Sequence, residues 1–209
     1  MSRLLYIESS PRKKRAASID VAHTFLNEYR ETHPTDEVIT LDLWNHDIPP
    51  FDGDIIDAKY AIMHNQAHTE AQRKAWRAVE HTIAEFKNAD KYVFSLPMWN
   101  FGIPYKLKHY IDVIVQPGYT FNYSPADGYK GLVTNKPALL ICARGGAYGS
   151  GTGGESLDLQ IPYMETILKF IGFTDIRSLI IEPMLSGPEV KDKAVQKAKE
   201  NAVKWANSF

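Results

Sequence analysis

The stretch Lys91-Tyr92-Val93-Phe94-Ser95-Leu96-Pro97-Met98-Trp99-Asn100-Phe101-Gly102-Ile103-Pro104 decides the fold. Its first six residues are an apolar run typical of a buried strand, and the rest display two aromatic rings and a carboxamide between prolines. Pro97 cannot continue a central ladder, and Gly102 lets a ligand approach the backbone closely. Because ligands of open parallel sheets lie beyond the carboxyl ends of strands, the stretch predicts a site for an aromatic ring at this edge. The alternative, a core role for Trp99 and Phe101, is disfavoured by their position at a strand end.

Four further runs are expected to be strands, and helical patterns separate them. The five expected strands cover residues 3–8, 37–42, 91–96, 137–143 and 176–182. Apolar residues recur between them at helical spacing, and the helix after the first strand is expected to begin near Ala17. Continuous apolar strands are typical of sheets covered on both faces. The pattern predicts an α/β fold with a five-stranded parallel sheet and helices on both faces. This suits a flavodoxin-like strand order of 2-1-3-4-5, which the sequence alone does not fix.

The whole chain, residues 1–209, is expected to form a single domain, because this length is enough to bury one sizeable core. The formal net charge of -1 gives no bulk reason to expect nucleic acid or a charged membrane as a partner. The one cysteine, Cys142, lies in an apolar run and is expected to be a buried, inert thiol. Since no internal disulfide is possible, a cytoplasmic location is expected.

Two long connections fall outside the minimal strand and helix pattern, at residues 44–68 and 116–136. The second of them resembles a short hairpin or flap. Ordered connections of this length are usually functional or interfacial, so both are expected to serve a site or a subunit contact.

The first strand leads into a loop suited to a phosphate group. A helix N-terminus offers free N–H groups and partial positive charge, and Ser10 and Ser18 are the hydroxyls in reach. A plain N-cap is an equally good interpretation of Ser18. A solvated basic loop is the favoured interpretation of residues 12–15, which a nearby ligand phosphate would put to use.

The fourth strand ends in a diglycine, Gly145-Gly146, followed by a glycine-rich segment. Gly149, Gly151 and Gly154 have the spacing G-x-G-x-x-G, but that fingerprint belongs in a tight turn between a strand and its helix. Several residues separate the strand end from Gly149, so a dinucleotide-binding turn is rejected here. The diglycine is better placed to bring backbone N–H groups against the edge of a ring.

Other catalytic patterns are missing from the sequence. It holds no G-x-S-x-G elbow, no H-E-x-x-H and no metal-spaced set of cysteines or histidines, so neither a catalytic side chain nor a metal site is expected. A phosphate loop, an aromatic loop and a diglycine loop on successive strand ends suggest instead that a cofactor carries the chemistry. FMN would use all three loops.

At these loops the sequence resembles the family of FMN-dependent NADH-azoreductases and NADH:quinone oxidoreductases. Residues 97–104 and 143–146 carry the resemblance most strongly, and residues 106–112 and 118–121 support it. It extends over nearly the whole chain. It implies a flavodoxin-like three-layer sandwich, one FMN per subunit and a homodimer.

The resemblance also implies which residues hold FMN. Its phosphate and ribityl end falls on Ser10, Ala16, Ala17 and Ser18, and its isoalloxazine is bordered by Met98, Trp99, Asn100, Phe101, Ala143, Arg144, Gly145 and Gly146. The N–H groups of Asn100 and Phe101 are expected at the N5 edge, and those of the diglycine at the N1–C2=O edge. Phe121, from the flap, is expected to bind substrate as part of an apolar lid; Tyr119 and Tyr123 could share the lid or pack a dimer.

Two positions depart from the family pattern. Ala16 and Ala143 stand where the family commonly has hydroxyl side chains, so two contacts to FMN are lost. Binding is expected to survive through Ser10, Ser18 and backbone N–H groups, with Arg12 or Arg15 as a charge-assisted partner.

The activity implied by the resemblance is a two-step, or ping-pong, reduction. NAD(P)H passes hydride to the flavin and leaves, and a quinone or an aromatic azo compound then accepts the electrons. NADH is the expected donor. A flavodoxin-type electron carrier without a substrate pocket is the alternative, which the near-neutral charge and the long connections disfavour. A hydrolase would lack both nucleophile and metal ligands.

Overall fold

The computed structural model describes residues 1–64 and 66–209 of the chain. Five parallel strands form the central sheet: β1 (Arg3–Glu8), β2 (Glu37–Asp42), β3 (Lys91–Pro97), β6 (Pro137–Ala143) and β7 (Asp175–Ile181). Each predicted strand is confirmed to within one residue at either end. The order is β2-β1-β3-β6-β7. It differs from the predicted 2-1-3-4-5 in numbering, because two hairpin strands that lie outside this sheet come between β3 and β6 in the chain.

The strand register brings the loops that matter to one edge of the sheet. Glu8 at the end of β1 pairs with Ser95 of β3, and Pro97 at the end of β3 pairs with Ala143 of β6. The loops that follow β1, β3 and β6 therefore begin at nearly the same level. This is the sheet edge at which the sequence predicts a ligand.

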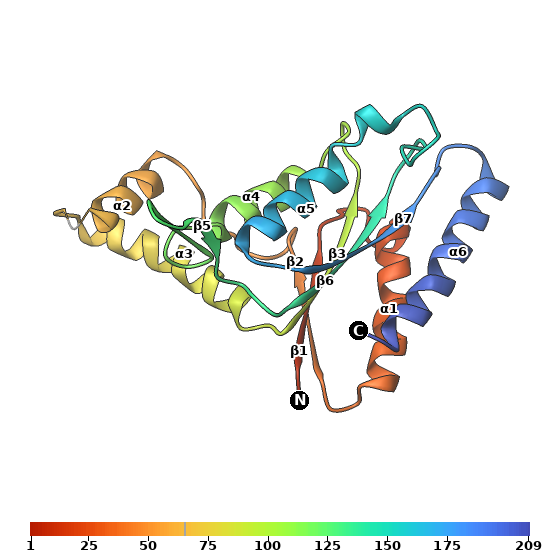
Figure 1. Ribbon diagram of the computed structural model, residues 1–209, viewed down its shortest axis with the longest axis horizontal. Coiled ribbons are helices and arrows are strands. Elements are labelled where there is room, and N and C mark those ends of the chain that lie inside the picture. Colours follow the sequence, from red (N-terminus) through yellow and green to blue (C-terminus); the bar gives the residue numbers. More distant parts are fainter. Residues whose placement is uncertain (65) are drawn as a thin grey trace.

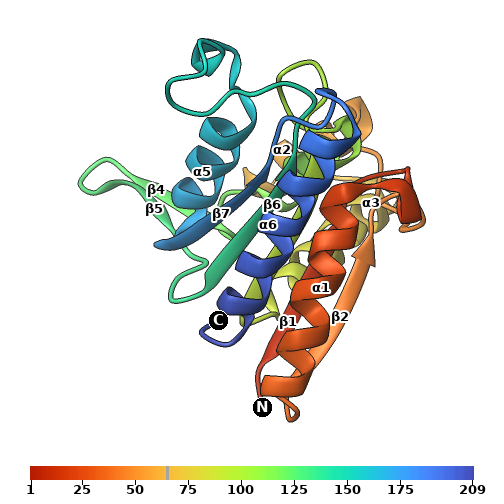
Figure 2. The ribbon, with the colours of Figure 1, turned by 90° about the vertical axis from the view of Figure 1, so that its right-hand side faces the viewer.

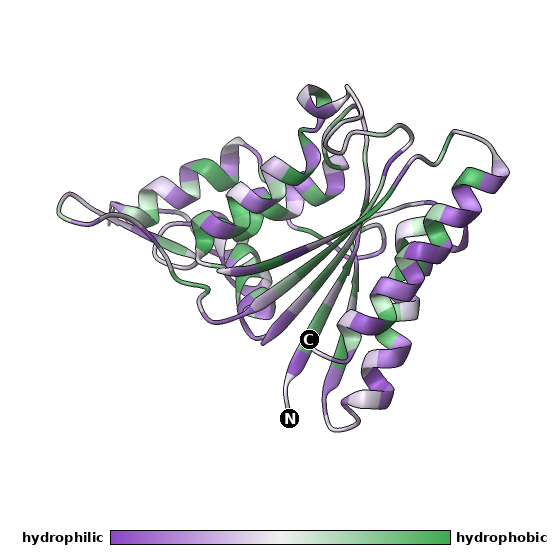
Figure 3. Ribbon diagram, turned by 45° about the vertical axis from the view of Figure 1, so that its right-hand side comes forward, coloured by the Kyte–Doolittle hydropathy of each residue, from purple (hydrophilic) through white to green (hydrophobic). Residues whose placement is uncertain are grey.

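Helices cover both faces of the sheet, which gives three layers (Figure 1). On one face α1 (Ala17–Thr32) and α6 (Pro188–Ala206) lie side by side (Figure 2). On the other face lie α3 (Glu70–Lys87), α4 (Tyr105–Ile114) and α5 (Gln160–Ile171), and α2 (Gly53–Met63) packs on α3. Two separate apolar clusters fill the spaces between the layers, and apolar stretches run along the strands of the sheet and along the helices that cover it (Figure 3). The three central strands β1, β3 and β6 are buried almost throughout, which explains their continuous apolar runs, whereas the edge strands β2 and β7 are partly exposed.

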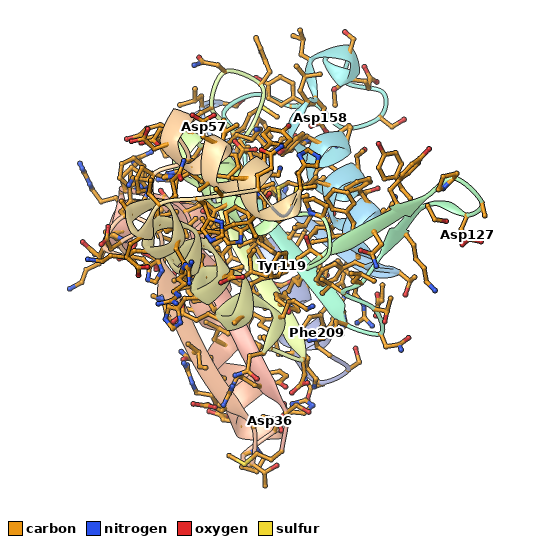
Figure 4. The ribbon with its side chains drawn as sticks, turned by 90° about the vertical axis from the view of Figure 1, so that its left-hand side faces the viewer. Asp36, Asp57, Tyr119, Asp127, Asp158 and Phe209 are labelled. Carbon is orange, nitrogen blue, oxygen red and sulfur yellow. The ribbon has the colours of Figure 1, made fainter. Side chains whose placement is uncertain are left out.

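The connection at residues 116–136 is a hairpin of β4 (Phe121–Ser124) and β5 (Gly128–Gly131), as the sequence predicts. Asp127 lies at its projecting tip (Figure 4). The connection at residues 44–68 contains α2; residue 65 of this prediction lies outside the described residues. Two short 3-10 turns, η1 (Lys13–Arg15) and η2 (Glu155–Leu157), lie in the loops after β1 and β6.

Cys142 is fully buried in β6, and burial raises the pKa of its thiol to about 12. The prediction that this thiol is buried is confirmed. Among the described residues, no helix has the length and apolar character needed to cross a membrane.

Candidate functional site

The loops that follow β1, β3 and β6 line one cavity of about 770 Å³ at the carboxyl edge of the sheet. This volume is in the range of small-molecule and cofactor sites. The predicted FMN-site residues on its wall are Ser10, Ala16, Ala17, Ser18, Met98, Trp99, Ala143, Arg144 and Gly145. Asn100, Phe101 and Gly146 adjoin these residues in the chain but do not line the cavity. The structure thus brings together the three loops that the sequence singles out.

The N-terminus of α1 forms one end of this cavity. The N-cap is Ala16, which has no side chain to cap the helix, and the N–H of Asp20 is the first to find a helical acceptor, the carbonyl of Ala16 at 3.0 Å. Within the described chain no protein group accepts from the N–H groups of residues 17–19. The hydroxyl of Ser18 is also without a partner, although the residue is only 1% exposed. The interpretation of Ser18 as a plain N-cap is therefore wrong, and its buried Oγ is available to a ligand oxygen.

Lys13 anchors the loop that precedes α1. Its ammonium contacts the Glu8 carboxylate at 2.7 Å and the Asp42 carboxylate, at the ends of β1 and β2. Although burial opposes it, hydrogen bonds to these two carboxylates raise the pKa of Lys13. The backbone of Lys13 has a φ of 47°, a strained conformation for a residue with a side chain. The favoured interpretation of residues 12–15 as a solvated basic loop therefore does not hold for Lys13, whose ammonium is bound by two carboxylates.

The other three cations of the run, Arg12, Lys14 and Arg15, line the cavity. Lys191 from α6 lines it as well. Sequence reasoning missed this lysine, because it lies far along the chain in a helix whose visible pattern is only amphipathic. Two carboxylates share the wall, Asp20 and Asp192, and Asp20 is paired with Lys199 at 2.9 Å. The wall nearest the α1 N-terminus is therefore mainly cationic.

A tight turn follows β3. The N–H of Trp99 donates to the carbonyl of Gly102 at 3.1 Å, and the N–H of Gly102 donates to the carbonyl of Trp99 at 2.9 Å. The two central residues, Asn100 and Phe101, have φ values of 47° and 68°, as in a type I′ turn. A phenylalanine in this region costs on the order of 1 kcal/mol and persists only where its surroundings hold it.

Contacts from the loop after β6 hold the strained turn in place. The carbonyl of Phe101 accepts from the N–H of Leu159 at 3.1 Å, and its ring meets the ring of Tyr148 edge to face at 6.2 Å. Among the described residues nothing accepts from the N–H groups of Asn100 and Phe101. Two backbone donors are therefore presented at the end of β3.

The diglycine presents a second pair of backbone donors. The carbonyl of Arg144 accepts from the N–H of Met184, and the carbonyl of Gly145 accepts from the N–H of Leu185, both at 3.0 Å. A trans peptide points its N–H opposite to its carbonyl, so the N–H groups of Gly145 and Gly146 point away from residues 184–185. Neither donates to another group in the part of the chain that the structure describes. Successive N–H groups aimed the same way form a concavity for negative charge.

The glycine-rich segment after the diglycine is not a dinucleotide-binding turn. The next helix, α5, begins only at Gln160, and the N–H of Gly149 donates to the carboxylate of Glu182 at 3.0 Å. A dinucleotide-binding turn needs a helix directly after it, so this arrangement agrees with the rejection of that interpretation for Gly149, Gly151 and Gly154.

Arg144 turns its side chain inward. The guanidinium is fully buried and contacts Asp158 at 2.7 Å, Glu182 at 3.5 Å and the amide oxygen of Gln160 at 3.1 Å. Asp158 lies among the loops above the sheet edge (Figure 4). Since this side chain is committed to protein groups, only the backbone of Arg144 is available to a ligand. Neither carboxylate was predicted, because each lies more than ten residues along the chain from Arg144.

Phe121 lies outside the cavity. Its ring packs on Phe170 of α5 at 4.7 Å and on Tyr129 of the hairpin at 6.0 Å. The hairpin extends away from the loops that carry the site (Figures 2 and 4). Within one chain Phe121 therefore does not cover the cavity, and its role in substrate binding stays a prediction.

A second, apolar groove of about 990 Å³ adjoins the cavity, with Trp99 on the wall of both. Trp99 lies beside Trp44 at 6.1 Å and Tyr105 at 6.3 Å between ring centroids. The groove is lined by Phe51, Trp99, Asn100, Gly102, Ile103, Tyr105, Lys108, His109, Asp112, Leu159, Pro162, Tyr163 and Thr166. A flat aromatic molecule suits such a wall of rings. Across residues 1–64 and 66–209 no group of three His, Cys, Asp or Glu side chains could hold a metal ion.

Comparison with known proteins gives one consistent result. Residues 2–206 match the model of a family described by its flavodoxin-like fold. A protein of Desulfotalea psychrophila named FMN-dependent NADH:quinone oxidoreductase is 48% identical over 100% of this chain and 98% of its own length. A protein of the same name from Nitratidesulfovibrio vulgaris is 47% identical over the full length of both.

Solved structures agree with these relatives. An azoreductase from Bacillus anthracis superposes with a TM-score of 0.92 at 32% identity and covers 100% of both chains. A second structure from Bacillus anthracis, an FMN-dependent NADH-azoreductase in complex with FMN, has a TM-score of 0.88 at 27% identity and covers 99% of this chain and 100% of its own.

Proposed function

The chain belongs to the flavodoxin-like family of FMN-dependent NADH:quinone oxidoreductases, and from this we propose that it uses FMN to reduce quinones and aromatic azo compounds with NADH. The observation that carries the proposal is the cavity at the sheet edge. Its wall carries the buried Ser18 hydroxyl with the α1 N-terminus and the Gly145 N–H, and the unused N–H groups of residues 100–101 and of Gly146 follow directly on wall residues in the chain. FMN offers acceptors for these donors.

The residues of the cavity fit FMN in three parts. We propose that the α1 N-terminus, Ser10 and Ser18 hold its phosphate, since anions favour helix N-termini with free N–H groups. Residues 98–101, after β3, and residues 143–146, after β6, would border its ring. Ala16 and Ala143 contribute no hydroxyl, so the site depends mainly on backbone donors. The proposal takes residues 1–209 as one FMN-binding domain.

When bound, FMN would supply the redox chemistry by accepting a hydride from NADH and passing two electrons to the acceptor in a separate half-reaction. The N–H groups of Gly145 and Gly146 are preorganised donors that would stabilise negative charge where it develops. The ring of Trp99 and the apolar groove beside it would orient a flat donor or acceptor and exclude water. No acid or base side chain is assigned a role.

A flavodoxin-type electron carrier is the alternative function. Such a carrier holds FMN but needs no pocket for a second aromatic molecule. The groove of about 990 Å³ that shares Trp99 with the cavity favours the reductase. Turnover of NADH with a quinone separates the two functions.

We also propose that the chain forms a homodimer. Large apolar side chains are exposed on α2, with Ile56 38%, Tyr60 51% and Met63 49% exposed. Such a patch on a protein is typical of an interface. Phe121 could contribute to a substrate site only through a second chain, because the hairpin extends away from the cavity of its own chain. The cytoplasmic location inferred from the cysteine content stays a prediction.

An anaerobic reduction experiment tests the function. The protein is reconstituted with FMN, its visible spectrum is recorded, and NADH is added, followed by a benzoquinone. Flavin absorbance that bleaches with NADH and returns with the quinone is the expected result. Bound flavin that NADH cannot reduce would favour the carrier, and a protein that binds no flavin would refute the proposal.

A further inference from the structure

A buried ion network lies directly beneath the diglycine. The Arg144 guanidinium is 0% exposed, and its two carboxylate partners, Asp158 and Glu182, are 14% and 16% exposed. An arginine is rarely buried to this extent, and its planar fork can address several acceptors in fixed directions. Here the three directions lead to Asp158, Glu182 and the amide of Gln160.

Each carboxylate of the network also binds backbone N–H groups. Glu182 accepts from the N–H groups of Tyr148 and Gly149, both at 3.0 Å, in the middle of the loop between β6 and α5. Asp158 accepts from the N–H groups of Gln160 and Ile161, at 3.0 and 3.1 Å, where α5 begins. Arg144 stands at the start of the same loop. The network therefore ties together the beginning, the middle and the end of the segment that carries the diglycine.

We infer that Arg144 and Glu182 are positioning residues, which act through the backbone by aiming the Gly145 and Gly146 N–H groups into the cavity. This inference rests on the proposed FMN function. Backbone donors have no side chain of their own to hold their direction, and glycines are the most flexible residues. The contacts of residues 184–185 hold the diglycine itself, and Glu182 holds the loop that continues from it and the Arg144 side chain that precedes it.

A positioning role makes a prediction that mere structural support does not. If the two N–H groups face the part of FMN that gains negative charge on reduction, their misalignment weakens binding of reduced FMN more than binding of oxidised FMN. The midpoint potential of the bound flavin then falls. Loss of a purely structural contact lowers thermal stability and leaves the potential unchanged.

Two charge-conserving variants test this, Glu182→Asp and Arg144→Lys. The aspartate retains the negative charge but withdraws from Tyr148 and Gly149, and the lysine retains the positive charge but loses the fork. The matched controls are Glu165→Asp and Arg177→Lys, whose ion pairs with Lys169 and Asp175 lie on the surface. For each FMN-loaded protein we would measure the melting temperature, the FMN dissociation constant by fluorescence quenching, and the midpoint potential by anaerobic dye equilibration.

We expect the affinity for reduced FMN, relative to oxidised FMN, to fall about tenfold in Glu182→Asp, which corresponds to about 30 mV for a two-electron couple. Arg144→Lys should shift the potential in the same direction, and the controls should not shift it. If Arg144→Lys fails to fold, the milder Glu182→Asp still decides. Potentials that match the wild-type value while FMN stays bound would overturn this inference alone. A wild-type protein that binds no FMN would overturn the proposed function.

Discussion

Replacement of Ser18 with alanine should change stability and cofactor affinity in opposite directions. In the chain without ligand the buried Ser18 hydroxyl has no partner, and an unsatisfied buried hydroxyl costs about 1–3 kcal/mol. Ser18→Ala removes that cost, and alanine is also the better helix residue, so the apoprotein should become about 1 kcal/mol more stable. In the complex the same hydroxyl would donate to a phosphate oxygen. A hydrogen bond to a charged group contributes about 1.5–3 kcal/mol, so the affinity for FMN should fall about 10- to 150-fold.

The assay combines thermal unfolding of the apoprotein with titration of FMN and of riboflavin, which lacks the phosphate. The affinity for riboflavin should not change in Ser18→Ala. Ser178→Ala is the matched control, because the Ser178 hydroxyl on β7 is also buried without a partner and does not line the cavity. It should stabilise the apoprotein and leave both affinities unchanged. A Ser18→Ala protein with wild-type affinity for FMN would refute the placement of the phosphate at the α1 N-terminus.

Three further predictions concern charge, pH and assembly. Arg15→Gln should weaken binding of FMN severalfold, with little effect on riboflavin, and should reduce the salt dependence of FMN binding, because an exposed cation on the cavity wall acts through a screened field. Burial alone would raise the pKa of Asp42, but the Lys13 ammonium and other hydrogen bonds lower it. The Lys13–Asp42 pair therefore stabilises the fold above about pH 4, and this contribution is lost as the pH falls further. Lys13→Met should accordingly flatten the loss of stability in acid, measured by urea unfolding between pH 3 and 6; an unaltered pH profile would contradict the coupling. Met63→Glu should shift the protein from dimer to monomer in analytical ultracentrifugation, and a wild-type protein that sediments as a monomer would refute the proposed interface.

The sequence predicted the framework of the site because its signals are local. A strand buried on both faces is a continuous apolar run, so the ends of β1, β3 and β6 could be located to within a residue. Because the three strands pair in parallel, their carboxyl ends lie at nearly the same level at one edge of the sheet. The hairpin between β4 and β5 was also visible, as a long connection between two strands.

What the sequence could not provide are contacts between distant segments. Lys191, Met184 and Leu185 reach the cavity only because α6 and the end of β7 fold back beside the loop after β6. Ser18 was left between two interpretations, since the choice depends on where the helix begins. The structure places the N-cap two residues earlier, at Ala16. The inward turn of Arg144 is equally a matter of three-dimensional packing.

The site can tolerate alanine at positions 16 and 143 because most of its hydrogen-bond donors are backbone N–H groups. Ala16 and Ala143 stand where relatives are expected to offer hydroxyls, yet the loops around them still present N–H groups at 17–19, 100–101 and 145–146. A backbone donor does not depend on the side chain at its own position, only on what fixes the direction of the peptide. Residues outside the cavity wall fix these peptides in place. Lys13 and Glu182 do so through their side chains, and Leu159 does so through its N–H group. Substitutions at Lys13 and Glu182, which act through their side chains, should therefore disturb the site more than substitutions at several of the residues that line it.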